Sequence, residues 1–413
     1  MRGLLLLLCA AALCPAQEPL TLADAEAITL ERHPSLRKVA AAVDAAEARR
    51  KQAGRYPNPT IGATGDELSR VPELRGGEFG AFIEQRIVTG GKLSLEQRVR
   101  EHERSAAEAD LDAQRQRALN HMRALFYAAL AAGRLVEVQT RLAGVAREAV
   151  TVTRQLANVG QADRPDLLQA EIEAQGAEMA LEQARLEQES LWRQLAAAMG
   201  DPAMARRDLA GALEELPVLT HQDAIERILA ESPELDHAAA EIARAEARVD
   251  RERAQVVPDI KAEGGFRHNP AIFIRGQPIG REAFFQVGVD LPLFNRNRAG
   301  IAAAKAELEG ARAEAEWVKL SLHERLAAVY AEFASSAILA KRYREEMLPR
   351  AEEAYRLQMA GFQRMAAAYP QALIAQRGWF ELQRDYVRAL NRVWQAAVVI
   401  EGMLLTGDLD DAM

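Results

Sequence analysis

The chain has few groups that could cross-link it or bind a metal tightly. Its 2 cysteines are Cys9 and Cys14, both near the N-terminus, so the rest of the chain can form no disulfide and no cysteine-ligated metal site. Its 7 histidines are scattered without the short spacing of metal ligands. Only 5% of the residues are aromatic. We therefore expect no bound metal and no cofactor.

The sequence also lacks a complete catalytic motif. His102-Glu103 and His323-Glu324 begin like the helical motif of zinc proteases, but Ala106 and Ala327 occupy the positions that require a second histidine. Gly90-Gly91-Lys92-Leu93 has neither the earlier glycine nor the Ser/Thr of a phosphate-binding loop. These absences predict that the protein is not an enzyme.

Strong basic character and long apolar runs are missing as well. The formal net charge is −8, which disfavours nucleic acid as a partner because phosphate backbones need a basic surface. After position 20 no apolar run approaches the ~20 residues of a transmembrane helix. Charged residues make up 27% of the chain, and Ala, Leu, Glu, Arg and Gln crowd its long segments. This composition is typical of long helices and coiled coils.

The first residues indicate secretion. Arg2 is the positive start, residues 4–13 are the apolar core, and Cys14-Pro15-Ala16 provides a small-residue cleavage site before Gln17, so residues 1–16 are predicted to be a signal peptide. The run is too short for a membrane anchor. Lipidation is disfavoured because Cys14 follows a leucine rather than a small residue.

The most informative feature that is present is an internal repeat. Pro34 corresponds to Pro233, an offset of 233 − 34 = 199, and Asp24-Ala25 corresponds to Asp223-Ala224 at the same offset. Two copies of one long unit predict a pseudo-symmetric assembly. We expect a first repeat over residues 17–200, a linker over 201–215, a second repeat over 216–407 and a loose tail over 408–413.

Each repeat is expected to contain short helices, a β-hairpin and a long helical hairpin. The hairpins are predicted over residues 59–88 and 258–293, and the helical hairpins over 92–200 and 298–407. In the second β-hairpin, strands over residues 259–267 and 283–293 are expected to flank a loop that contains Pro270, Gly276, Pro278 and Gly280. Residues 92–158 contain no proline, which predicts a helix about 100 Å long. Coiled-coil spacing with small residues recurs every seven positions within it, at Met122, Ala129, Val136, Ala143 and Val150.

The four predicted strands alternate apolar and polar residues, and their length of roughly ten residues spans a bilayer when a strand is tilted. Four strands cannot close a barrel, and open sheet edges do not occur in lipid, so the barrel would be shared between chains. The polar residues Lys261, Glu263, Gln286 and Asp290 would then line its lumen. The alternative is a soluble coiled-coil protein with two edge hairpins.

The order of helix, hairpin, long helix, tip and helix, occurring twice, resembles the TolC-like outer membrane efflux proteins. Several motifs share in this resemblance: Tyr56-Pro57-Asn58-Pro59 before the first strand, Gln85 to Lys92 and Leu291 to Arg298 at strand-to-helix junctions, and Val159 to Asp163 followed by Asp166 to Glu171 at a tip. The resemblance covers nearly the whole predicted mature chain.

The resemblance implies a mainly α fold with a membrane β-barrel. Three chains would form a homotrimer with a twelve-stranded barrel in outer membrane lipid and a helical tunnel in the periplasm. The protein would be a passive exit duct that docks a periplasmic adaptor and an inner membrane efflux pump, and its motifs are most similar to the branch that serves heavy-metal cation pumps. A periplasmic scaffold or adaptor, or a type I protein-secretion duct, are the alternatives.

The two tips are the candidate functional sites. No Asp or Glu occurs between residues 361 and 377, so acidic rings at a gate would come from Asp163 and Asp166 of the first tip, with Arg364 as a partner in closing ion pairs. The same two acids could instead be helix caps. The residues assigned to adaptor docking and gating are Val159, Gly160, Gln161, Ala162, Asp163, Asp166, Gly361, Arg364 and Tyr369.

Overall fold

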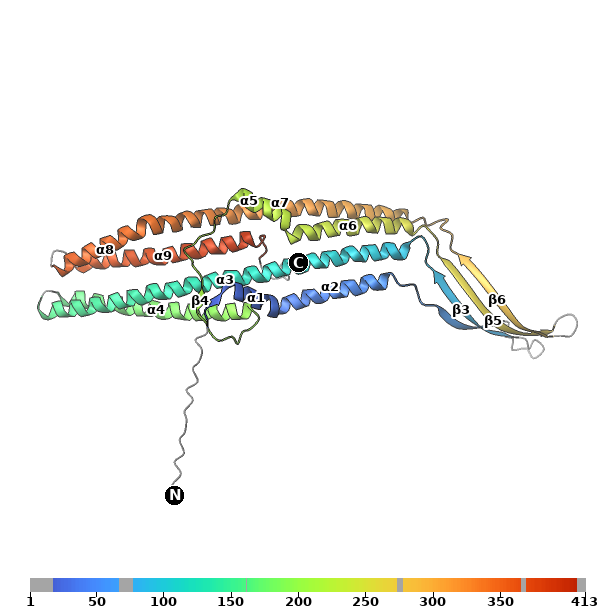
Figure 1. Cartoon of the computed structure of the whole chain (residues 1–413), viewed down its shortest axis with the longest axis horizontal. Helices are drawn as coiled ribbons and strands as arrows, with labels where there is room; N and C mark the ends of the chain where they lie inside the picture. Colours follow the sequence, from blue (N-terminus) through green and yellow to red (C-terminus); the bar gives the residue numbers. More distant parts are fainter. Residues whose placement is uncertain (1–17, 67–76, 161, 273–277, 365–368, 407–413) are drawn as a thin grey trace, which may run out of the picture. The chain divides into compact units, whose positions relative to one another are not determined.

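A computed structural model describes residues 18–66, 77–160, 162–272, 278–364 and 369–406 (Figure 1). The predicted signal peptide and the tail over residues 408–413 lie outside the described residues. Long helices dominate the described part, which also contains a two-stranded and a four-stranded sheet. None of the helices in these ranges is both long enough and apolar enough to cross a membrane.

The same order of elements occurs in both halves of the sequence. The first half contains α1 (Leu22–Arg32), α2 (Pro34–Ala53), β2 (Thr60–Asp66), β3 (Glu78–Ile87), α3 (Lys92–Asn158) and α4 (Arg164–Ala198). The second half contains α5 (His221–Glu231), α6 (Pro233–Ala254), β5 (Ile260–Ile272), β6 (Pro278–Val289), α7 (Arg298–Arg342), a π-helical turn (Tyr343–Met347), α8 (Leu348–Gln363) and α9 (Tyr369–Glu401). A short parallel pair joins β1 (Leu20–Thr21) to β4 (Leu209–Ala210).

Local residue chemistry sets the ends of the longest helix. Gly90 and Gly91 adopt φ values of 64° and 67° just before α3 begins, and Gly160 has φ 73° just after it ends. Glycine occupies this left-handed region without steric cost, so these positions interrupt the helix. Between them α3 runs for 67 residues, which confirms the predicted helix over residues 92–158.

Contacts divide the chain into two units, and each contains parts of both halves of the sequence. Unit 1 comprises residues 1–36, 114–228 and 323–413, and unit 2 comprises 37–113 and 229–322. In unit 1 the large buried side chains Met122, Phe126, Leu195 and Met199 form one core. Farther along α3 the core consists mainly of alanines, with Ala143, Ala146, Ala174, Ala177 and Leu181 in one cluster. Small side chains let α3 and α4 approach closely along the predicted seam.

The end of α9 is fixed by a buried amide. Asn120 of α3 is 3% exposed and donates hydrogen bonds to the carbonyl oxygens of Gly402 and Leu405, both at 2.8 Å. The intervening Met403 and Leu404 adopt φ values of 60° and 61°, which is uncommon for residues other than glycine. The Asn120 amide therefore helps to hold a strained turn that closes the core of unit 1.

Unit 2 contains the four-stranded antiparallel sheet, in the order β2-β3-β5-β6. Strands β5 and β6 extend farther toward their connecting loop than predicted, since residues 270 and 278 were expected in that loop. An irregular register between Asn269 and Ile272 accompanies Pro270, and such irregularities accommodate a residue without an N–H. At the other end β6 stops at Val289, so the expectation of a strand to Leu293 is wrong.

Replacing Asn120 by alanine should destabilise unit 1. The change removes two hydrogen bonds to carbonyls at the end of α9, and we expect a loss of about 1–3 kcal/mol. Asn158→Ala, at an exposed position of α3, is the control. Limited proteolysis during heating would measure the difference, and equal midpoints for the two variants would contradict this role of Asn120.

Candidate functional site

The four-stranded sheet has one apolar face. Its register places Ile61 opposite Ile83, Ile83 opposite Gly264, and Gly264 opposite Phe285, so these positions share a face. The large apolar side chains of this face are 40–78% exposed in the single chain. They are Ile61, Phe79, Ile83, Ile87, Phe266, Phe285, Val287 and Val289. Such a large exposed apolar surface indicates contact with another apolar medium.

The opposite face is mainly polar, although Phe82 and Phe284 also lie on it. It carries Lys261, Glu263 and Gln286 of the four residues predicted to line a lumen, and Asp290 follows directly after the end of β6. Glu263 lies opposite Gln286, and the Lys261 Nζ is 3.1 Å from an Asp290 carboxylate oxygen. Sequence reasoning missed further charged members of this face, although the alternation of β3 and β5 could have identified them. They are Glu78, Glu84, Arg267 and Glu282, of which Arg267 forms ion pairs with Glu78 at 3.0 Å and Glu282 at 3.3 Å.

The two edges of the sheet are open in the single chain. Strands β2 and β6 each pair on one side only among the described residues. Unpaired backbone groups tolerate water but are very costly in lipid. The sheet therefore combines a face suited to an apolar medium with edges that must pair with something before they enter one.

A charged cluster fixes the junction between β3 and α3. Asp259, just before β5, accepts hydrogen bonds from Lys92 Nζ at 2.7 Å, from Arg86 Nε at 2.9 Å and from the Thr89 backbone N–H at 3.2 Å. Burial alone raises the pKa of the Asp259 carboxyl, but these bonds outweigh it and lower the pKa to about 2. In the Gly90-Gly91-Lys92 motif, the two glycines form the turn between β3 and α3. The ammonium group of Lys92 binds Asp259 and so joins this turn to the start of β5.

The first tip is a tight reversal between α3 and α4. Asp163 caps α4 by accepting a hydrogen bond from the Asp166 backbone N–H at 2.9 Å, which confirms that it is a helix cap. Gly160 has open space around the position of a Cβ, so its positive φ alone requires glycine. Val159 is 68% exposed at the start of the turn, and Gln161 lies outside the described residues. Ala162 donates its backbone N–H to the Leu156 carbonyl oxygen.

The second tip lies between α8, which ends at Gln363, and α9, which begins at Tyr369. Gly361 lies within α8, and the helix continues to Gln363, so this glycine does not form the turn. Arg364 follows as an exposed C-cap residue whose backbone N–H bonds the Ala360 carbonyl. The side chain of Tyr369 is not among those described. No ion pair joins Arg364 to Asp163 or Asp166 within the described part of one chain.

Contacts between the two helical hairpins lie close behind the tips. Glu173 of α4 binds Arg377 of α9 through a hydrogen bond and an ion pair. Within the first hairpin, Arg154 of α3 binds Glu171 of α4 at 2.8 Å. Leu373 packs against Ala149 and Ala170. Sequence reasoning did not identify the Glu173–Arg377 pair, because residues 204 positions apart carry no local signal of contact.

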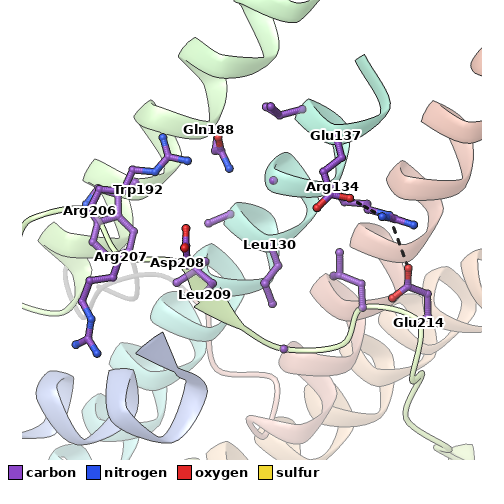
Figure 2. A pocket seen from close by; sticks show the side chains of 15 residues that line it. Leu130, Arg134, Glu137, Gln188, Trp192, Arg206, Arg207, Asp208, Leu209 and Glu214 are labelled. Atoms are coloured by element: carbon purple, nitrogen blue, oxygen red, sulfur yellow. Dashed lines mark hydrogen bonds and ion pairs between the residues drawn. The ribbon is translucent and has the colours of Figure 1, made fainter. Parts of the chain in front are cut away.

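A groove of about 640 Å³ occurs elsewhere in unit 1, among α3, α4 and the segment that follows α4 (Figure 2). Charged groups surround it: Arg134 pairs with Glu137, and also with Glu214 at 3.9 Å. None of the residues predicted to be functional lines it. Across the described ranges, no group of three or more His, Cys, Asp or Glu side chains could hold a metal ion.

Replacing Asp259 by asparagine should loosen the strand-to-helix junction. Because the folded-state pKa is lowered, the carboxylate stabilises the fold above the usual Asp range near 3.8, and this contribution is lost as pH falls toward about 2. Allowing for solvent screening, we expect Asp259→Asn to cost about 1–2 kcal/mol at neutral pH.

The difference in unfolding free energy between wild type and Asp259→Asn should be constant above about pH 5 and shrink toward pH 2. A double-mutant cycle with Lys92→Met would assign the coupling to this pair. A pH-independent difference would contradict the assignment.

The family model for "Outer membrane efflux protein" matches residues 27–201 and again residues 224–404. The two matched segments correspond to the two halves that share one order of elements. Together they cover most of the chain.

Known proteins agree with this match. The chain is 25% identical over 386 residues to the cobalt-zinc-cadmium resistance protein CzcC of Cupriavidus metallidurans, covering 94% of this chain and 90% of the relative. Its fold matches that of CusC, with a TM-score of 0.77, 15% identity and coverage of 94% and 92% of the two chains. It also matches the outer membrane protein VceC of Vibrio cholerae, with a TM-score of 0.75, 18% identity and coverage of 94% and 96%. The chain therefore belongs to the outer membrane efflux protein family and is an efflux protein of the outer membrane.

Proposed function

We propose that the chain is one third of a trimeric exit duct. Three copies of the four-stranded sheet would form a closed barrel of twelve strands, with β6 of one copy paired to β2 of the next. Closure satisfies both open edges, places the apolar face against lipid and leaves the polar face around a water-filled lumen. The observation that carries this proposal is that the large exposed apolar side chains of the sheet lie on one face, whereas most of its charged side chains lie on the other.

The long helices would form the periplasmic part of the duct. Their buried faces consist largely of alanine, while the remaining surface carries many Arg–Glu pairs. Such helices can pack side by side in a ring and keep a hydrated surface on both sides of the wall. The duct itself is passive, and an inner membrane pump and a periplasmic adaptor would supply the substrate.

We assign heavy-metal cations as the exported substrate. The support is the likeness to CzcC, a cobalt-zinc-cadmium resistance protein, over 94% of this chain. The polar face of the sheet carries Glu84, Glu263 and Asp290 together with the basic residues Lys261 and Arg267. Mixed charge of this kind lets cations pass without holding them at one place, as a passive duct requires.

The tips are the proposed sites of adaptor docking and gating. Val159, Leu168 and Ile172 are 68%, 48% and 61% exposed near the first tip, which suits an apolar contact with a partner protein. Asp163 and Asp166 would form acidic rings in the trimer, and the exposed Arg364 of a neighbouring copy would pair with them in the closed state. Gly160, Ala162 and the second-tip residues Gly361 and Tyr369 belong to the same proposed docking region.

Phe285 and Gln286 test the barrel directly, because they are adjacent in β6 and lie on opposite faces of the sheet. Phe285→Arg would place a charge against lipid, at a cost of about 2–4 kcal/mol, and should abolish insertion into the outer membrane. Gln286→Arg is the matched control and should insert normally. Membrane fractionation and electrophoresis without heating would show a trimer for wild type and for Gln286→Arg only.

Equal insertion of both variants would contradict the barrel. Recovery of the wild-type protein as a water-soluble monomer in the periplasm would favour a scaffold or adaptor instead. Dependence of the host cell on the protein for resistance to cobalt, zinc or cadmium tests the proposed substrate, and unchanged resistance after its deletion would reject it.

A charge change at the first tip tests the gate. Asp163→Asn keeps the side-chain oxygen that caps α4 but removes the charge, whereas Asp163→Lys reverses it. If the acidic ring helps to close the duct, single-channel conductance in planar bilayers should rise from wild type to Asp163→Asn and further to Asp163→Lys. Identical currents for all three proteins would remove the gating role of Asp163.

A further inference from the structure

The segment that leads from β6 into α7 exposes an unusual amount of apolar surface. Leu291 and Leu293 are 67% and 66% exposed, and Phe294 is 101% exposed (Figure 1 shows β6 and α7 on either side of the segment). Beyond the end of β6, the two leucines continue the sequence pattern in which every second residue is apolar, as at Phe285, Val287 and Val289. Leaving these side chains in water is unfavourable, so the segment is suited to an apolar surrounding.

Two unpaired cations follow directly. Arg296 and Arg298 are exposed, and neither forms a hydrogen bond or an ion pair with any residue that the structure describes. Most arginines on the neighbouring α6 differ in this respect; Arg248 binds Glu307 and Arg251 binds Glu96, for example. Exposed guanidinium groups without a carboxylate partner are available to an external anion.

The segment is held in one conformation by contacts with α6. The Asn297 side-chain amide donates to the Glu252 carbonyl oxygen at 2.9 Å and to its carboxylate at 2.7 Å. Its backbone N–H bonds the Asn295 side chain at 3.0 Å. Glu252 is in turn bound by Arg251 at 3.0 Å. These hydrogen bonds fix the backbone of the segment that carries Phe294 and the two arginines.

Apolar and cationic groups meet around one hollow of about 380 Å³. It is lined by Leu293, Phe294, Asn295, Arg296, Arg298 and Ala299. The planar fork of a guanidinium group matches the oxygens of a phosphate, and two such groups can share one. The combination of an apolar wedge with guanidinium groups matches a molecule that has an acyl chain beside a phosphate.

A similar combination precedes the opposite edge of the sheet. Tyr56 is 62% exposed and adjoins Arg55, an exposed arginine without a hydrogen-bonding or ion-pairing partner for its side chain among the described residues. These residues lead into β2, whereas the segment over 291–298 follows β6, and β2 and β6 are the two edge strands. Aromatic and basic residues thus flank both edges at the end of the sheet that is joined to helices.

We propose that residues 291–298 form a phospholipid-binding anchor. Leu291, Leu293 and Phe294 enter the acyl region, and Arg296 and Arg298 bind the headgroup phosphate of an anionic phospholipid in the leaflet that faces the periplasm. The inference rests on the proposed function, because the barrel fixes which end of the sheet faces the periplasm. Aromatic and basic side chains are enriched at this level of membrane proteins, where apolar and charged layers meet.

The experiment uses the full chain reconstituted in phosphatidylcholine bilayers. The relative association of spin-labelled phosphatidylglycerol and phosphatidylcholine is measured by electron paramagnetic resonance. Wild type should prefer phosphatidylglycerol by at least about threefold. The variant R296Q/R298Q should lose this preference, and Phe294→Ala should reduce the immobilised fraction of both lipids. The control R356Q/R392Q removes two exposed arginines from α8 and α9 and should behave as wild type.

Three results would overturn the proposal. The first is an unchanged preference in R296Q/R298Q. The second is loss of the wild-type preference on adding excess inorganic phosphate, which would indicate a site for any free anion. The third is dissociation of the trimer by R296Q/R298Q with no change in lipid preference, which would assign the segment to contact between copies. Channel conductance of the same samples separates the two claims: a conducting wild type without lipid preference rejects only the anchor.

Discussion

The rest of the molecule depends on one constraint in the four-stranded sheet. A single sheet combines an apolar face, a mainly polar face and two edges whose backbone groups are unpaired within the described residues. Ile83 and Phe285 lie on one side, and Glu263 and Gln286 lie on the other. No isolated chain can satisfy both faces and both edges in water or in lipid. In the proposed duct, assembly of several copies would resolve this conflict, and the strand-to-helix junctions, the helices and the tips would take their roles from that arrangement.

The helices contribute stability in a different way. Their seams are built from alanines such as Ala143 and Ala174, and the helix surfaces carry many exposed Arg–Glu pairs that are individually weak. Stronger anchors occur where elements change direction. Asn120 holds the end of α9, and Asp259 joins Lys92 and Arg86 at the sheet. Close helix packing combined with a few fixed corners suits a wall whose surface must remain hydrated.

Much of the fold followed from local sequence, whereas the contacts between distant segments did not. The bounds of α3 were predictable because Gly90, Gly91 and Gly160 interrupt an otherwise unbroken helical pattern. Three lumen candidates, Lys261, Glu263 and Gln286, fell on one face of the sheet because strand alternation has a period of two. The predicted loop was wrong at residue 270, because β5 continues past this proline with an irregular register. The Glu173–Arg377 pair was missed because its two residues are far apart in the chain. Docking and gating at the tips remain predictions.

Electron cryo-microscopy of the detergent-solubilised, full-length protein tests the central claim most directly. The account predicts three copies around one axis, with their sheets closed into a barrel of twelve strands, the Phe285 side chains facing detergent and the Glu263 side chains facing the lumen. A water-soluble particle in which the sheets remain open, or an assembly with the Glu263 face turned toward detergent, would contradict it.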